Sequence, residues 1–184
     1  MAGHLRIIAG RWGGRRILVP PGARVRPTSD RVREAWMSIL AADLEGARVL
    51  DLFAGSGALG IEALSRGAAH VTFVESDPRV LRVLRANLDA LGVSTEAQVV
   101  RADGLRYLLE VEPERYDLVF ADPPYGRGLA DATLRAFRTG SAARILALEH
   151  HRDDAVDPPP DSIRRVYGDT VLLFVRNDAT PKEA

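Results

Sequence analysis

The chain has 184 residues, a net charge of zero and no cysteine. This length suits one domain with a small appendage, and the lack of cysteine excludes a disulfide framework and thiolate metal sites. No segment has the pattern of a signal peptide or the length of a membrane span. We therefore expect a cytoplasmic protein, by default a monomer, with no metal site and no membrane contact.

Positive charge is concentrated at the amino-terminal end. Residues 1–33 contain eight arginines and one acid, Asp30, which gives this segment a net charge of +7 and leaves −7 for the remainder. A basic arm on an acidic body suits a polyanionic partner such as a nucleic acid.

The first elements in chain order are a hairpin and a helix. Strands at 5–9 and 16–19, separated by glycines, predict a β-hairpin with a loose loop. A helix follows Thr28 or Ser29, and its apolar side chains at helical spacing run from Val32 to Leu44.

From residue 48 onward, strands alternate with helices, which predicts an α/β fold with a doubly wound, Rossmann-like sheet of seven strands. We place the strands at 48–53, 70–75, 97–101, 116–121, 144–149, 163–167 and 170–176, the last two as a hairpin. The helices are placed at 58–66, 77–91, 104–110 and 129–137. We divide the chain into a basic arm (1–22), a catalytic domain (23–177) and a flexible tail (178–184).

A glycine motif joins the first strand of this sheet to its helix. Gly55, Gly57 and Gly60 form a G-x-G-x-x-G pattern, and Glu75 ends the next strand twenty residues after Gly55. Glycines let the backbone turn sharply next to a ligand, and an acid at this place binds a ribose in Rossmann-type folds. The motif predicts an adenosine-containing ligand.

Asp51 distinguishes between two such ligands. It precedes Gly55 by four residues, where a carboxylate would repel the pyrophosphate of NAD(P). S-adenosylmethionine carries an ammonium and a sulfonium instead, which an acid attracts, so we expect this cofactor. Asp103, just after the third strand, is placed to meet the adenine amino group.

A second motif, Asp122-Pro123-Pro124-Tyr125, follows the strand that should lie beside the glycine loop. The two prolines stiffen this segment. The Asp122 carboxylate and the Pro123 carbonyl could accept both hydrogens of an exocyclic base amine and turn its lone pair toward the methyl group. Tyr125 would stack on the flipped base.

With these motifs, the sequence resembles the class I methyltransferases that carry a D/N-P-P-Y/F motif. It is most similar to the RsmD family, which methylates N2 of a guanine in bacterial 16S ribosomal RNA. The resemblance rests on residues 6–10 with Arg15 and Arg16, on 26–34, on 51–60 and on 116–125. It implies action on the small ribosomal subunit or its assembly intermediate, and a cofactor site closed by Arg26, Pro27 and Thr28.

The predicted sites are as follows. The cofactor site comprises Arg26, Pro27, Thr28, Asp51, Phe53, Gly55, Ser56, Gly57, Glu75, Ser76, Asp103 and Gly104, and the catalytic site Asp122, Pro123, Pro124 and Tyr125. The RNA-binding site comprises Arg6, Arg11, Trp12, Arg15 and Arg16. Arginine pairs with phosphate and Trp12 could stack on a base; the alternative is a solvated hairpin whose Trp12 packs on the body. Deleting residues 1–19 should then abolish RNA methylation and spare cofactor binding.

Three other functions remain open. A DNA adenine or cytosine amino-methyltransferase shares the Asp-Pro-Pro-Tyr chemistry, but it normally needs a recognition region, and ordinary strand–helix units fill Gly60 to Asp122. A protein-glutamine methyltransferase usually has Asn at the first motif position. A non-enzymatic RNA-binding protein would not need the acids and glycines.

His150 and His151 are expected to be loop residues after the fifth strand.

Overall fold

The computed structural model describes residues 3–20, 30–140 and 142–177. Its strands are β1 (Gly3–Arg6), β2 (Arg16–Val19), β3 (Arg48–Asp51), β4 (His70–Glu75), β5 (Ala97–Arg101), β6 (Leu118–Ala121), β7 (Ile145–His151), β8 (Ile163–Tyr167) and β9 (Thr170–Arg176). Its helices are α1 (Asp30–Ile39), α2 (Ala41–Leu44), α3 (Ala58–Ser65), α4 (Pro78–Leu91), α5 (Gly104–Glu110) and α6 (Leu129–Gly140), with a 3-10 turn η1 (Gly10–Trp12).

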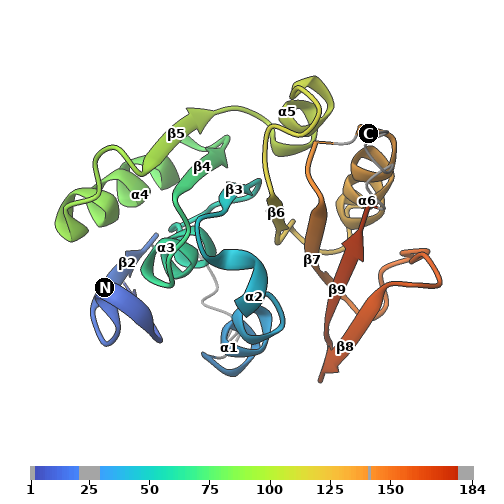
Figure 1. Cartoon of the computed structure of the whole chain (residues 1–184), viewed down its shortest axis with the longest axis horizontal. Helices are drawn as coiled ribbons and strands as arrows, with labels where there is room; N and C mark the ends of the chain where they lie inside the picture. The colour runs from blue at the N-terminus through green and yellow to red at the C-terminus, as the bar shows by residue number, and fades with distance from the viewer. Residues whose placement is uncertain (1–2, 21–29, 141, 178–184) are drawn as a thin grey trace, which may run out of the picture.

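Seven of these strands form one sheet in the order β5-β4-β3-β6-β7-β9-β8 (Figure 1). The five strands β3 to β7 are parallel, and β9 and β8 continue the sheet antiparallel beside β7. The chain builds the sheet outward from β3 in one direction and then returns to β6 on its other side. The predicted doubly wound sheet, with a terminal hairpin, is confirmed.

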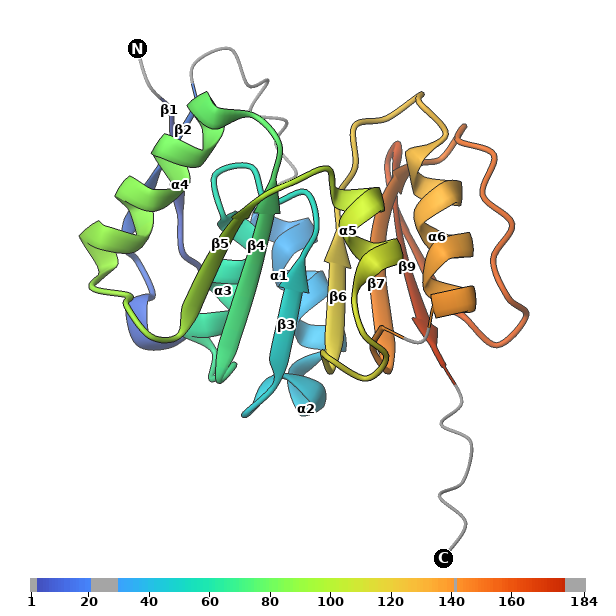
Figure 2. The same cartoon turned by 90° about the horizontal axis from the view of Figure 1, so that it is seen from above.

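Helices cover both faces of this sheet, as expected for strands whose side chains are apolar on both sides. In Figure 1, α5 and α6 lie on one side of the sheet, and α1, α2 and α3 lie on the other. Figure 2 shows that the loops after the parallel strands, the glycine loop among them, leave the sheet at one common edge. This edge is where ligands bind in open α/β folds.

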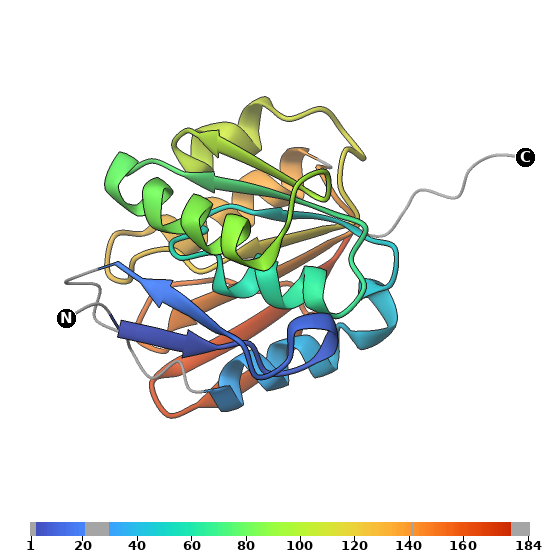
Figure 3. The ribbon, with the colours of Figure 1, turned by 90° about the vertical axis from the view of Figure 1, so that its left-hand side faces the viewer.

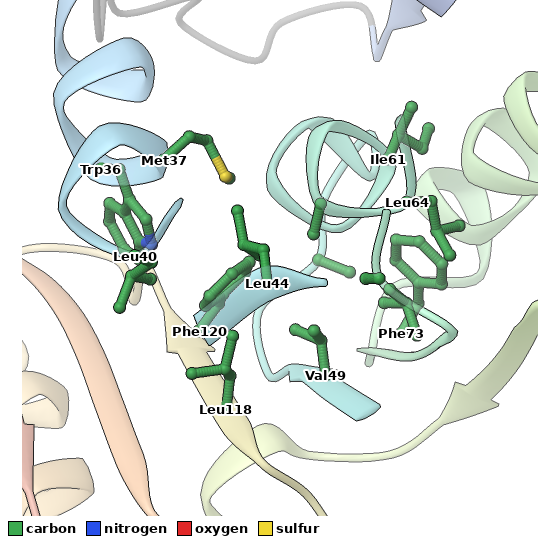
Figure 4. Packing of buried hydrophobic residues seen from close by; sticks show 14 of the residues in the cluster. Trp36, Met37, Leu40, Leu44, Val49, Ile61, Leu64, Phe73, Leu118 and Phe120 are labelled. Carbon is green, nitrogen blue, oxygen red and sulfur yellow. The ribbon is translucent and has the colours of Figure 1, made fainter. Parts of the chain in front are cut away.

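The larger of the two buried clusters lies under α1 and α3 (Figure 4). The Trp36 ring is fully buried, and it meets Phe120 of β6 edge-to-face at 5.8 Å and Phe174 of β9 at 6.2 Å. Such aromatic pairs favour this geometry. Trp36 thereby joins the helix before the sheet to two of its strands.

Two predicted boundaries near the amino terminus differ from the structure. The first hairpin strand is Gly3–Arg6, because the chain leaves the ladder after Ile7 to form η1. The single helix expected up to Leu44 breaks at Leu40, whose φ of −95° and ψ of 5° are not helical. Leu40 at this break and Leu44 after it are both buried. The predicted apolar face is therefore confirmed, but the predicted single helix is two helices.

Smaller differences occur at the ends of other elements. β7 extends to His151, so His150 and His151 lie in the strand and not in a loop after it. The helix expected at 77–91 is α4, and both of its ends are capped: Asp77 accepts a hydrogen bond from the Arg79 amide at 2.7 Å, and Gly92 closes the helix with a φ of 73°.

Candidate active site

The glycine loop and the Asp-Pro-Pro-Tyr segment begin at neighbouring strand ends. β3 pairs in parallel with β6, and Asp51 lies level with Phe120, two residues before Asp122. On its other side β3 pairs with β4, where Asp51 lies level with Phe73, two residues before Glu75. The fold therefore brings three acids from three strands to one edge of the sheet.

Two glycines of the loop adopt backbone conformations that other residues rarely take. Gly55 has a φ of 55°, and Gly57 has a φ of 85° at the start of α3. A Cβ atom on Gly57 would lie 2.5 Å from Leu84 Cδ1, whereas a Cβ atom on Gly55 would meet only the Phe53 carbonyl oxygen at 3.9 Å. The loop is thus tight against α4 at Gly57 and open at Gly55, the arrangement that a backbone-bound ligand requires.

The third glycine of the motif serves packing. A Cβ atom on Gly60 would lie 2.3 Å from the Phe73 ring and 2.9 Å from Val71 Cγ1. Only glycine therefore lets α3 approach β4 this closely, which is the role of the last glycine in this kind of motif.

Asp51 and Glu75 hold the glycine loop in place. Asp51 Oδ2 accepts a hydrogen bond from the Gly60 amide at 3.0 Å. Glu75 Oε2 accepts from the Gly55 amide at 3.1 Å, and its other oxygen accepts from the Asp77 amide at 2.8 Å. Both predicted cofactor acids therefore contact the loop or the helix that it starts.

The Asp51 carboxyl is buried, with 2% of its surface exposed. Its pKa is raised to about 7, mainly by burial and further by the negative charges of Asp122 and Glu75, against the Gly60 hydrogen bond that lowers it. Near neutral pH, the protonated and ionised forms of Asp51 therefore coexist in the free protein.

This raised pKa predicts a pH-dependent stability. Because the folded protein binds a proton that the unfolded chain has lost, the contribution of Asp51 to the free energy of unfolding falls as pH rises from 3.8 to about 7. The slope approaches about 1.4 kcal/mol per pH unit. Urea unfolding measures the free energies of unfolding of wild type and Asp51→Asn across this range. The difference between these two free energies should change with pH. A constant difference would contradict the shift.

Asp103, the remaining predicted cofactor acid, begins α5 by accepting a hydrogen bond from the Arg106 amide at 2.9 Å. Its neighbour Gly104 is buried against Leu52 and Phe53, which lead into the glycine loop. A Cβ atom on Gly104 would lie 2.4 Å from the Leu52 carbonyl oxygen and 3.0 Å from the Phe53 ring. Phe53, Asp103 and Gly104, all predicted for the cofactor site, thus lie together. Ser76 is exposed beside Glu75, with 3.5 Å between its hydroxyl and the carboxylate.

The Asp-Pro-Pro-Tyr segment starts directly after β6. Asp122 and Tyr125 are half-buried, Pro123 is buried and Pro124 is exposed. The Tyr125 hydroxyl donates a hydrogen bond to Glu149 Oε1 at 2.7 Å. The segment is therefore held at the same sheet edge as the glycine loop, with its aromatic ring anchored.

The basic amino-terminal hairpin packs on the domain, beside α3 and α4 (Figure 3). The buried Glu62 carboxylate accepts from the amides of Ile8 and Ala9 at 2.8 and 3.0 Å. Asn87, also buried, accepts from the Leu18 amide and donates to the Leu18 carbonyl oxygen. The hairpin thus completes the hydrogen bonding of two buried polar side chains on the helices below it.

One predicted RNA contact is wrong in this structure. Trp12 has 5% of its surface exposed and belongs to the main core cluster, with its amide bound to Ser65 Oγ at 3.0 Å. The Arg11 guanidinium covers its ring, 4.7 Å from the centroid. The ring is therefore unavailable for stacking on a base, and the alternative of packing on the body applies.

The predicted cofactor residues Arg26, Pro27 and Thr28 lie outside the described residues. Among the described residues, Asn87 belongs to the site although no sequence motif predicted it. Its side-chain amide donates to the Ser56 carbonyl oxygen at 2.9 Å, in addition to its bonds with Leu18. One buried amide therefore links the hairpin to the cofactor loop. An asparagine between Leu84 and Leu88 on the apolar face of α4 was the signal that could have revealed it.

Comparisons with known proteins show the family to which the chain belongs. A family model described as conserved hypothetical protein 95 matches residues 5–175. The Escherichia coli protein named ribosomal RNA small subunit methyltransferase D is 44% identical over 72% of this chain and 66% of its own length. The chain belongs to the RsmD family. The Haemophilus influenzae member with the same name is 42% identical over 72% of this chain and 69% of its own length.

Solved structures resemble this RsmD-family chain over more of its length. An Escherichia coli structure, described provisionally as methyltransferase YhhF, has a TM-score of 0.80 and 38% identity, and covers 95% of this chain and 98% of its own. The Thermus thermophilus 16S rRNA N2 G1207 methyltransferase RsmC, solved with AdoMet and guanosine, has a TM-score of 0.69 and 25% identity, covering 96% of this chain and 50% of its own.

Membership of the RsmD family confirms the predicted class I methyltransferase fold, the enzyme class and S-adenosylmethionine as cofactor. The names of both curated relatives agree with the predicted activity on small-subunit ribosomal RNA. None of the helices in the described part of the chain is long and apolar enough to cross a membrane.

Proposed function

We propose that this protein transfers a methyl group from S-adenosylmethionine to N2 of a guanine in the ribosomal RNA of the small subunit. The observation that carries the proposal is the meeting of two motifs at one sheet edge. β3 and β6 are neighbours, and the charge of Asp122 acts on Asp51. A donor site and an acceptor site for a methyl group are thereby adjacent.

The residues of the glycine loop fit this cofactor. Gly55 leaves its backbone open, and Asp51, Glu75 and Asp103 supply acceptors for an ammonium, two ribose hydroxyls and an adenine amine. The same acids disfavour a pyrophosphate, because it would lie among like charges. When bound, the cofactor supplies an electrophilic methyl group on a positively charged sulfur.

The Asp-Pro-Pro-Tyr segment prepares the acceptor. The Asp122 carboxylate and the Pro123 carbonyl accept the two hydrogens of the exocyclic amine, so that its lone pair leaves conjugation with the ring. The Asp122 charge also stabilises the positive charge that develops on the nitrogen during transfer. Tyr125 provides an aromatic surface for the base, which must be unpaired to reach this edge.

We place the RNA contact on Arg6 and Arg16, which are cross-strand partners in the hairpin. Both are exposed and line a hollow of about 390 Å³ beside the hairpin, together with His4, Leu5 and Asp30. Arg6 has one long ion pair, with Asp30 at 3.9 Å. The other two hairpin arginines of the predicted set have closer partners within the protein. Arg11 pairs with Glu96 at 2.8 Å, and Arg15 donates to the Ala90 carbonyl oxygen at 2.6 Å.

Replacing Arg6 and Arg16 together with alanine should weaken RNA binding and reduce its dependence on salt, by about one unit of slope for each phosphate that the protein no longer neutralises. Cofactor affinity should not change. Arg135→Ala on α6 is the matched control, because this exposed arginine lies on the opposite face and pairs only with Asp131 among the described ion pairs. An unchanged salt slope in the double variant would exclude this contact.

The acceptor class is tested by offering the enzyme labelled cofactor with small ribosomal subunits, duplex DNA or a protein extract. We expect the label in RNA. Label in DNA or in protein would support the two rival functions of this motif.

We also propose that the enzyme acts as a monomer in the cytoplasm, where the subunit or its assembly intermediate is found. Sedimentation of the enzyme alone tests whether it is a monomer.

A further inference from the structure

The Tyr125 side chain is anchored at its far end by two strands outside the predicted site. Its hydroxyl donates to Glu149 of β7 and lies 3.4 Å from Thr170 Oγ1 at the start of β9. Glu149 has 1% of its surface exposed. A buried carboxylate needs hydrogen-bond donors, and the tyrosine hydroxyl is one of them.

This hydroxyl remains a donor over the working range of pH. Burial and the negative charge of Glu149 both raise the pKa of Tyr125 above its ordinary value, so the phenol stays protonated. Hydrogen bonds between a neutral donor and a charged acceptor are stronger and shorter than neutral pairs. The bond is therefore suited to fixing the direction of the ring.

A second pair of contacts ties the segment after Tyr125 to the same strand. Asp154 accepts from the Gly126 amide at 3.1 Å and from the His151 amide at 3.0 Å. The His151 ring packs against the Tyr125 ring, with 5.5 Å between centroids and 55° between planes. Two prolines stiffen the segment before Tyr125, so the tyrosine is held on both sides along the chain.

The register of the sheet explains why Glu149 reaches this place. β6 and β7 are parallel, and Ala121 lies level with Leu148. The next residues, Asp122 and Glu149, therefore lie side by side at the sheet edge. One acid is at the start of the catalytic segment, and the other holds the aromatic ring three residues later.

We propose that Glu149 is a positioning residue for methyl transfer. By holding the Tyr125 hydroxyl, it fixes the orientation of the ring against which the target base packs. This inference rests on the proposed function, because it takes residues 122–125 as the site of the base. Small misplacements of a reacting group cost large factors in rate, so a fixed ring contributes to turnover.

Three substitutions separate the hydrogen bond from the charge and the ring. Tyr125→Phe keeps the ring and removes the hydroxyl, and should lower kcat on RNA about ten-fold. Glu149→Leu removes the acceptor and should cause a similar loss, with no further loss in the double variant. Glu149→Gln keeps an oxygen that accepts the bond, and should stay within about three-fold of wild type.

The loss should appear in kcat, while the cofactor Kd stays unchanged in every variant. Tyr107→Phe is the matched control, because it also removes a tyrosine hydroxyl with a hydrogen bond, to the Tyr116 hydroxyl at 3.0 Å. It should retain wild-type kcat. If Glu149→Leu does not fold, the contrast between Tyr125→Phe and Glu149→Gln still decides the question.

Three results would overturn the proposal: wild-type kcat in Tyr125→Phe, losses that multiply in the double variant, or a Glu149→Gln enzyme as impaired as Glu149→Leu. Failure of the proposed function is read separately, from the nucleoside that the wild-type enzyme methylates. If that nucleoside is not a guanosine, the same variants are compared on the acceptor that is found.

Discussion

Asp122→Ala is expected to lower the rate of methyl transfer by about 10² to 10³, the usual cost of removing one group that stabilises charge in a transition state. Cofactor affinity should stay within a few-fold, because the groups that hold the glycine loop are Asp51 and Glu75. Single-turnover kinetics and a separate cofactor titration measure the two effects. Unchanged turnover would remove Asp122 from the mechanism.

Two further observations make this test specific. Asp122→Asn keeps a carbonyl oxygen that accepts a hydrogen bond but loses the charge, so its rate should lie between those of Asp122→Ala and wild type. The charge of Asp122 also contributes to the raised pKa of Asp51. Asp51 should therefore titrate at lower pH in both variants, which shows that each is folded around the same site.

Deletion of residues 1–19 is expected to unfold the domain, in contrast to the expectation from sequence that cofactor binding would survive. The deletion removes Ile7, Trp12, Ile17 and Val19, each at most 5% exposed. At about 1.5–3 kcal/mol for each buried side chain, the loss is comparable with the whole stability of a small domain.

The deletion would also remove hydrogen bonds from three buried polar side chains. Glu62, Ser65 and Asn87 all form hydrogen bonds with the hairpin backbone. Glu62 keeps its bond to Arg66 and Asn87 its bond to Ser56, so each hydrogen bond lost adds about 0.5–1.5 kcal/mol. Circular dichroism during heating, with and without cofactor, measures the result. A truncated protein with wild-type melting and cofactor affinity would show that the hairpin is an independent arm.

The sheet could be predicted because its evidence is local. Strands of apolar residues alternate with helices that carry caps such as Asp77 and Gly92, and the doubly wound rule then places β6 beside β3. The docking of the hairpin could not be predicted, since it depends on contacts more than fifty positions apart. The sequence signal for this docking is the presence of two polar residues, Glu62 and Asn87, on apolar helix faces.

The site residues that belong to a sequence motif could be predicted, but those brought to the site by the packing of other strands could not. Asp51, Gly55, Glu75 and Asp122 come together as the spacing indicated. Glu149 was missed because an acid near the end of an apolar strand resembles a solvent-exposed terminus. Its burial follows from β9, which pairs with β7 and brings Leu172 opposite it.

The central claim is that two adjacent loops transfer a methyl group to a guanine amine of small-subunit RNA. The direct measurement incubates the enzyme and labelled S-adenosylmethionine with small subunits from a strain that lacks the enzyme, and then identifies the labelled nucleoside. We expect N2-methylguanosine with wild type and its near absence with Asp122→Ala. N6-methyladenosine, or label in protein alone, would contradict the claim.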